Sequence, residues 1–124
     1  MKMNELVERV MEISGQNVYS CYQCGNCSAG CMFTDEMDML PHRVIALVQE
    51  GDESELEINT SWICASCFVC SVRCPRGLDV AAIMEALREI KIRERGFIKI
   101  DLRKVDIEKL PQIAITAAAQ KFTW

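Results

Sequence analysis

The cysteines are the residues whose type and spacing could do chemistry in this sequence. They form two runs with the same spacing, C-x2-C-x2-C-x3-C, and none lies outside these runs. The first run consists of Cys21, Cys24, Cys27 and Cys31, and the second of Cys64, Cys67, Cys70 and Cys74. A cubane [4Fe–4S] cluster has four iron corners that each need one thiolate, and three close cysteines with a remote fourth suit it. The spacing therefore favours two [4Fe–4S] clusters.

The fourth cysteine of each run is predicted to bind the cluster of the opposite run. This is the bacterial ferredoxin pattern, in which the last cysteine crosses to the other centre. One cluster would use Cys21, Cys24, Cys27 and Cys74, and the other would use Cys64, Cys67, Cys70 and Cys31. Pro75 completes the pattern after the second run. Met32 occupies that place after the first run, where it removes no ligand.

Other interpretations of the cysteines fit less well. Structural zinc usually takes paired C-x2-C knuckles, so a repeated triplet with a remote fourth cysteine is a poor match. A disulfide framework would need an oxidising compartment. A redox C-x2-C pair belongs in a βαβ context, which the sequence lacks. No serine, histidine and aspartate set accompanies the cysteines, and His42 is the only histidine. We therefore expect a non-catalytic chain with no substrate site of its own.

Composition limits the class of protein further. The 124 residues are enough for one compact domain. Half of them are hydrophobic and the net charge is −4, which argues against a nucleic-acid partner. The apolar runs are shorter than a membrane span needs. The first five residues, Met-Lys-Met-Asn-Glu, do not begin an apolar signal-peptide core. We expect a cytoplasmic protein, in which free cysteines favour metal ligation.

The pattern of apolar residues predicts helices that position the two runs. Helical spacing appears over residues 4–14, over 41–50 with Pro41 in the first turn, over 79–96 with an aspartate cap, and over 106–119. Residues 97–102 alternate enough to form a short strand instead, although no partner strand is evident. The sequence therefore predicts a small all-α protein.

The motifs resemble those of a known family. The insert between the two runs, residues 32–63, resembles that of the α-helical ferredoxin domains of succinate dehydrogenase and fumarate reductase. A closer resemblance is to the small C subunit of heterodisulfide reductase, in the order and spacing of residues 21–31, 41–45, 62–67 and 73–75. The resemblance implies two [4Fe–4S] clusters on the eight cysteines. It also implies electron relay between a flavin-containing iron–sulfur subunit and a catalytic subunit, which reduces a disulfide such as that of coenzyme M and coenzyme B.

These inferences divide the chain into three parts. We expect an N-terminal amphipathic helix over 1–17, an α-helical ferredoxin domain over 18–96, and a C-terminal tail over 97–124 whose apolar residues dock on a partner subunit. Three alternatives remain open. The chain could be a freestanding soluble dicluster ferredoxin, the iron–sulfur subunit of another oxidoreductase, or a zinc-stabilised interaction module.

Overall fold

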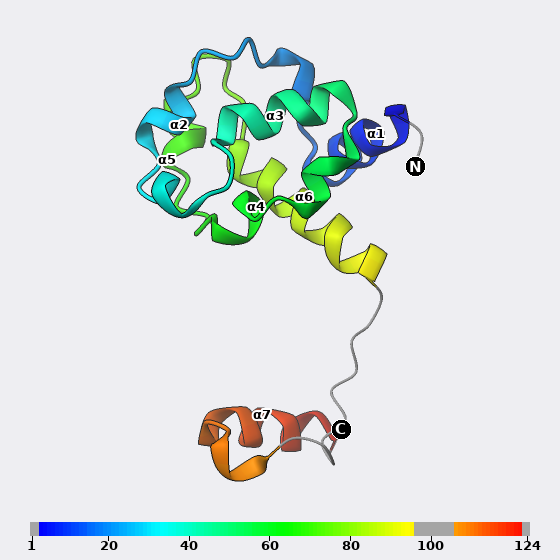
Figure 1. The fold of residues 1–124 in the computed structure, drawn as a ribbon, viewed down its shortest axis with the longest axis vertical. Helices are drawn as coiled ribbons and strands as arrows, with labels where there is room; N and C mark the ends of the chain where they lie inside the picture. Colours follow the sequence, from blue (N-terminus) through cyan, green and yellow to red (C-terminus); the bar gives the residue numbers. More distant parts are fainter. Residues whose placement is uncertain (1–2, 96–105, 123–124) are drawn as a thin grey trace.

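Helices are the only regular secondary structure in the computed structural model, which describes residues 3–95 and 106–122 (Figure 1). The α-helices are α1 (Met3–Ser14), α2 (Asn26–Gly30), α3 (Pro41–Glu50), α4 (Thr60–Ile63), α5 (Val69–Arg73), α6 (Val80–Arg95) and α7 (Gln112–Phe122). Short 3-10 helices are η1 (Val18–Ser20), η2 (Thr34–Glu36), η3 (Glu53–Glu57) and η4 (Ile107–Lys109). The prediction of an all-α protein is confirmed. The alternative strand over 97–102 lies outside the described residues.

Helix boundaries follow the signals in the sequence. Pro41 is the first residue of α3, where its missing N–H would have no partner. Gly51 ends that helix in the left-handed region at φ 70°, and its N–H donates to the carbonyls of Leu47 and Val48. The carboxylate of Asp79 accepts a hydrogen bond from the N–H of Ala82 at 3.1 Å, which caps the start of α6.

The hydrophobic core lies where α1 packs against both α6 and α3. Its buried side chains come from one face of each helix: Leu6, Val7 and Val10 of α1, Val44, Ile45 and Val48 of α3, and Val80, Ile83, Met84, Leu87 and Ile90 of α6. Burying each side chain of this size contributes about 1.5–3 kcal/mol. These three helices form the scaffold against which the cysteine runs are placed.

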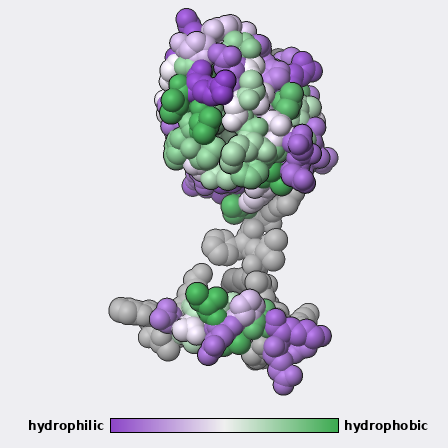
Figure 2. Space-filling view, turned by 90° about the vertical axis from the view of Figure 1, so that its left-hand side faces the viewer, coloured by the Kyte–Doolittle hydropathy of each residue, from purple (hydrophilic) through white to green (hydrophobic). Residues whose placement is uncertain are grey.

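Helix α7 stands apart from the body formed by residues 3–95 (Figures 1 and 2). Residues 111–117 are exposed, and the side chain of Ile113 is 80% exposed. Within the described residues, no helix is both long enough and apolar enough to cross a bilayer.

Candidate iron–sulfur site

The two cysteine runs repeat one backbone conformation. Gln23 and Ser66 each precede the second cysteine of a run with positive φ, at 63° and 53°. Gly25 and Phe68 each follow that cysteine in the left-handed region, at φ 80° and 64°. A five-residue helix then begins, α2 in the first run and α5 in the second, and the fourth cysteine caps its end. Where left-handed and right-handed residues follow one another, successive backbone N–H groups point into the same concavity. Such a concavity can bind an anionic group.

A serine in each run forms hydrogen bonds with the start of the long helix that follows the run. Ser28 Oγ accepts a hydrogen bond from the N–H of His42 at 3.1 Å and lies 2.6 Å from its Nδ1, at the start of α3. Ser71 occupies the same place in the second run. Its Oγ accepts from the N–H of Ala81 at 3.2 Å and donates to Asp79 Oδ1 at 2.7 Å, at the start of α6. Each run is therefore held beside the positive end of a helix dipole.

The two runs are neighbours because α2 packs against α5. They approach closely at Gly30, where an added Cβ would lie 2.7 Å from Arg73 Cδ and 3.2 Å from a methyl of Val69. Burial raises the pKa of the Cys70 thiol, and the nearby thiols of Cys64 and Cys27 raise it further against hydrogen bonds from the adjacent serine. Cys27 and Cys70 come from different runs, so the thiols of both runs share one region.

An apolar hollow is lined by three cysteines of the second run together with one cysteine of the first. It is lined by Cys31, Cys64, Cys67 and Cys70, with Phe33, Met37, Pro41, Ala65, Val80, Ala81 and Met84. The fourth cysteine of the first run therefore lies with the first three cysteines of the second.

The other end of the second run lies beside the first run. Arg76 follows Cys74 by two residues, and its Nε donates to the carbonyl of Ser20 at 3.3 Å, directly before Cys21. Both of these cysteines pack against the hydrophobic core.

The cysteines of the first run also influence one another. Burial raises the pKa of the Cys27 thiol, and the charges of Cys21 and Cys24 raise it further, against hydrogen bonds with Ser28. Buried thiols bind a metal group as thiolates, whose charge the bound iron compensates.

The cysteines do not converge on single points. Among residues 3–95 and 106–122, no group of three or more histidine, cysteine, aspartate or glutamate side chains could hold one metal ion. A cubane has no such requirement, because each thiolate binds a different iron at a different corner. The chemistry of the donor set, eight thiols in two concave loops, fits two clusters.

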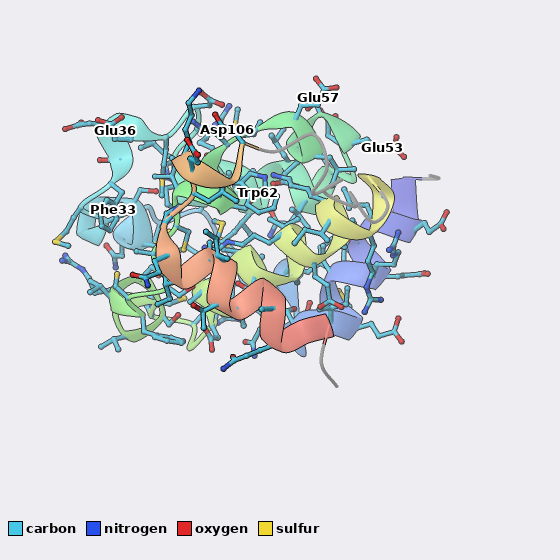
Figure 3. All side chains as sticks on the ribbon, turned by 90° about the horizontal axis from the view of Figure 1, so that it is seen from below. Phe33, Glu36, Glu53, Glu57, Trp62 and Asp106 are labelled. Atoms are coloured by element: carbon cyan, nitrogen blue, oxygen red, sulfur yellow. The ribbon has the colours of Figure 1, made fainter. Side chains whose placement is uncertain are left out.

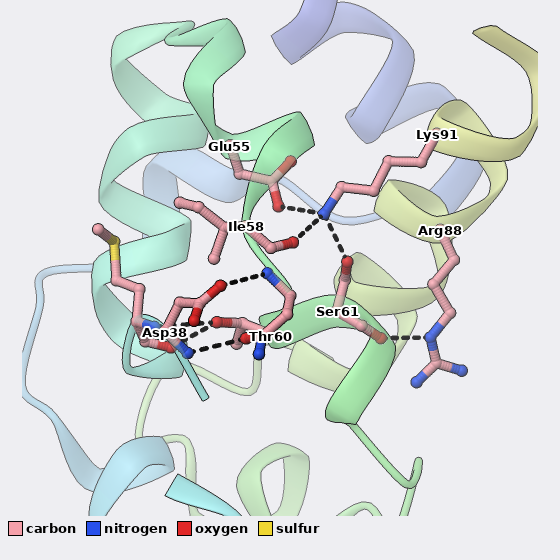
Figure 4. A network of polar contacts seen from close by, with 9 residues as sticks. Asp38, Glu55, Ile58, Thr60, Ser61, Arg88 and Lys91 are labelled. Atoms are coloured by element: carbon pink, nitrogen blue, oxygen red, sulfur yellow. Dashed lines mark hydrogen bonds and ion pairs between the residues drawn. The ribbon is translucent and has the colours of Figure 1, made fainter. Parts of the chain in front are cut away.

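A polar network behind the second run was missed by the sequence analysis (Figure 4). The Arg88 guanidinium of α6 donates to the carbonyls of Ser61 and Cys64, at the end of α4 where the second run begins. One turn further along α6, Lys91 Nζ donates to the carbonyl of Ile58 at 2.8 Å and to Ser61 Oγ at 2.7 Å. Two cations therefore hold the segment that leads into Cys64.

The same network contains a buried ion pair. Lys91 Nζ lies 3.4 Å from Glu55 Oε1, and both side chains are buried. Neither carboxylate oxygen of Glu55 accepts a hydrogen bond from the part of the chain that the structure describes. Glu53 and Glu57 of the same 3-10 helix instead point outward (Figure 3). Burial raises the pKa of Glu55, and the charge of Lys91 opposes that rise.

Comparison with known proteins identifies the class of this site. Residues 17–78 match the family described as a 4Fe–4S dicluster domain, and they make up half of the chain. The chain therefore belongs to the 4Fe–4S dicluster domain family, and it carries two [4Fe–4S] clusters. The cofactor prediction is confirmed.

Within that class the chain is similar to the C subunit of heterodisulfide reductase, as its motifs indicate. It is 29% identical over 103 residues to the C subunit of the ferredoxin:CoB-CoM heterodisulfide reductase of Methanosarcina mazei, covering 83% of this chain and 63% of that protein. The protein of the same name from Methanosarcina acetivorans is 38% identical over 74 residues, covering 60% of this chain and 30% of its own length.

A third relative is the C2 subunit of the H(2)/formate:CoB-CoM heterodisulfide,ferredoxin reductase of Methanococcus maripaludis. It is 29% identical over 101 residues, which cover 78% of this chain and 55% of that protein. The chain spans less than two thirds of the length of each of these three relatives.

Replacing Arg88 by glutamine should lower the reduction potential of the cluster nearest Cys64. Reduction adds one negative charge to a cluster, and the guanidinium on the Cys64 carbonyl stabilises that charge. We expect Arg88→Lys to retain most of the effect. Arg93→Gln is the control, because Arg93 pairs with Glu89 on the exposed side of the same helix. Redox titration followed by electron paramagnetic resonance measures both potentials. Equal potentials in Arg88→Gln and the unaltered protein would show that the arginine only packs.

Proposed function

We propose that this chain is an electron-transfer subunit of a cytoplasmic, heterodisulfide reductase-like complex. In this proposal it relays electrons from a flavin-containing iron–sulfur subunit to a catalytic subunit. The observation that carries the proposal is the packing of α2 against α5, which makes the two cysteine runs neighbours. When bound there, the clusters supply one-electron acceptors and donors at adjacent positions. The protein holds them, sets their surroundings and shields them from water.

The names of the relatives support a disulfide as the final electron acceptor. Each of the three names contains the CoB-CoM heterodisulfide, and each describes a C or C2 subunit of a reductase. We propose that the heterodisulfide is reduced in a separate catalytic subunit, and that this chain delivers the electrons.

We also propose the crossed ligand sets. The first cluster is held by Cys21, Cys24, Cys27 and Cys74, and the second by Cys64, Cys67, Cys70 and Cys31. The shared hollow supports the second set, because Cys31 lines it with the other three. The contact between Arg76 and Ser20 supports the first set, because it brings the end of the second run to the start of the first.

The direct test is anaerobic purification of the full chain with its native partners. The proposal expects about eight irons and eight sulfides in this chain once it is separated from its partners, since each cubane holds four of each. It also expects a visible absorption that bleaches when the flavin subunit is reduced. A colourless protein containing zinc would favour the interaction module. A monomer that holds both clusters and copurifies with no other subunit would favour a freestanding ferredoxin.

Deleting residues 110–124 should release the chain from its complex and leave both clusters in place. The deleted segment includes all of α7, whose exposed side chains make an apolar surface outside the body. Size-exclusion chromatography and iron content measure the two effects separately. If the shortened chain still copurifies at full stoichiometry, the tail is not the anchor.

A further inference from the structure

Phe68 combines two unfavourable features at one position. Its φ of 64° lies in the left-handed region, where a bulky side chain is a conformational outlier. The first run has Gly25 at the equivalent position, which takes this conformation without strain. The Phe68 side chain is also 53% exposed, so burial in this chain does not offset the strain. An aromatic residue kept at such a position indicates a role outside the packing of the monomer.

Phe68 belongs to a larger exposed apolar surface, which we call the α5 patch and define as Phe68, Val69, Val72 and Arg73. The N–H of Val72 donates to the carbonyl of Phe68 at 3.1 Å, so the two residues lie one helical turn apart on α5. The side chain of Val72 is 84% exposed. Figure 2 looks onto the end of the body that contains α2 and α5, where apolar residues cover much of the surface and hydrophilic residues flank them.

The α5 patch also adjoins an exposed cluster ligand. Cys67 directly precedes Phe68, and it is one of the two exposed cysteines of the chain, whereas Cys27 is buried. A protein bound at this patch would therefore lie beside the sulfur of the second run that is most accessible to it. Electron transfer requires such proximity between donor and acceptor.

We propose that the α5 patch docks the electron-transfer partner on the second cluster, and that this partner presents an apolar pocket edged by carboxylates. The inference deepens the proposed function and rests on it. The positive charge of the α5 patch favours a partner that carries carboxylates. Residues 64–77 contain Arg73 and Arg76 and no acidic residue, within a chain whose net charge is −4. Both arginines are exposed.

Two other occupants fit the charges less well. Helix α7 contains no acidic residue, so it offers nothing for Arg73 to pair with. A second copy docked symmetrically through the same patch would bring arginine against arginine, which is repulsive. A partner with an apolar pocket edged by carboxylates would bury the Phe68 ring and pair with the Arg73 guanidinium. Buried aromatic residues and arginines are common central anchors of stable interfaces.

The test places a photo-crosslinking amino acid at position 68 of the full chain in its native complex. We expect the crosslink to join a different subunit, at a peptide that contains carboxylates. A crosslink to residues 106–122 of this chain, a crosslink to a second copy, or no crosslink would each overturn the proposal.

Affinity for that crosslinked subunit provides the second measurement. Phe68→Ala removes the ring, and Phe68→Gly removes the ring and relaxes the backbone. Both variants should bind at least about tenfold more weakly, and Arg73→Glu should do the same. Tyr19→Ala is the matched control, because Tyr19 is 60% exposed on η1, outside the patch. Unchanged affinity of Phe68→Gly would overturn the proposal.

Iron content separates this inference from the function on which it rests. A chain without clusters would contradict the proposed function itself. Two intact clusters in every variant, with no loss of affinity, would contradict only the docking surface.

Discussion

Cys31→Ser and Cys67→Ser should perturb the same cluster, although the two cysteines belong to different runs. Both line the same hollow, and a crossed ligand set places both on the second cluster. Cys74→Ser should instead perturb the cluster that Cys24→Ser affects. Serine keeps the size of the side chain but offers a harder oxygen ligand, so the affected centre should shift in potential or convert to a three-iron form.

Electron paramagnetic resonance of the reduced variants assigns each substitution to a centre, provided that the two signals are first distinguished in the unaltered protein. Iron content checks that only one centre changes. If Cys31→Ser alters the signal that Cys24→Ser alters and spares the signal that Cys67→Ser alters, each run holds its own cluster.

Lys91→Met should destabilise the protein by about 3–5 kcal/mol, because it leaves a buried carboxylate without its ion pair. The same loss is expected for Glu55→Gln, which removes the negative charge that lies 3.4 Å from the buried ammonium group. We expect the anaerobic thermal midpoint of either variant to fall by about 10 °C or more. The double variant Glu55→Leu/Lys91→Met should recover most of the loss, since no charge is then buried. Equal instability in the single and double variants would show that the loss of stability comes from altered packing and not from a buried unpaired charge.

The Lys91→Met variant should also respond to pH. Burial already raises the pKa of Glu55, and removing the lysine removes the charge that opposes the rise. A group with a raised folded pKa contributes stability that is present at low pH and lost as pH rises through that value. Relative to the unaltered protein, the variant should therefore lose stability as pH rises from the ordinary pKa of a glutamate to the raised pKa of Glu55. A stability difference that does not change with pH anywhere above about pH 4 would contradict a raised pKa of Glu55.

The helices and the cofactor were predictable because their signals are local. Pro41, Gly51 and Asp79 act within one turn of the helix ends that they define, and the spacing of apolar residues depends only on the helical period. The cysteine spacing is equally local, since it reflects the geometry of one ligand loop.

The network behind the second run could not be predicted in the same way. Arg88 and Lys91 have partners 24 to 36 residues earlier in the chain, and no short sequence motif indicates such a pairing. One signal was present: Lys91 lies four residues after Leu87 and seven after Met84, on the buried stripe of α6. A charged residue at such a position indicates a buried partner, but the sequence does not say that the partner is Glu55.

The packing of α1 against α6 determines when the clusters can be inserted during biosynthesis. The first helix of the body packs against α3 and, more extensively, against the last helix, so the core around Leu6 and Val10 is complete only when the segment around Leu87 and Ile90 has left the ribosome. When only the first cysteine run has been synthesised, the helical core that positions the cysteines is therefore still incomplete. We expect both clusters to be inserted only after both runs and α6 have been synthesised, because the scaffold that holds the cysteines is complete only then.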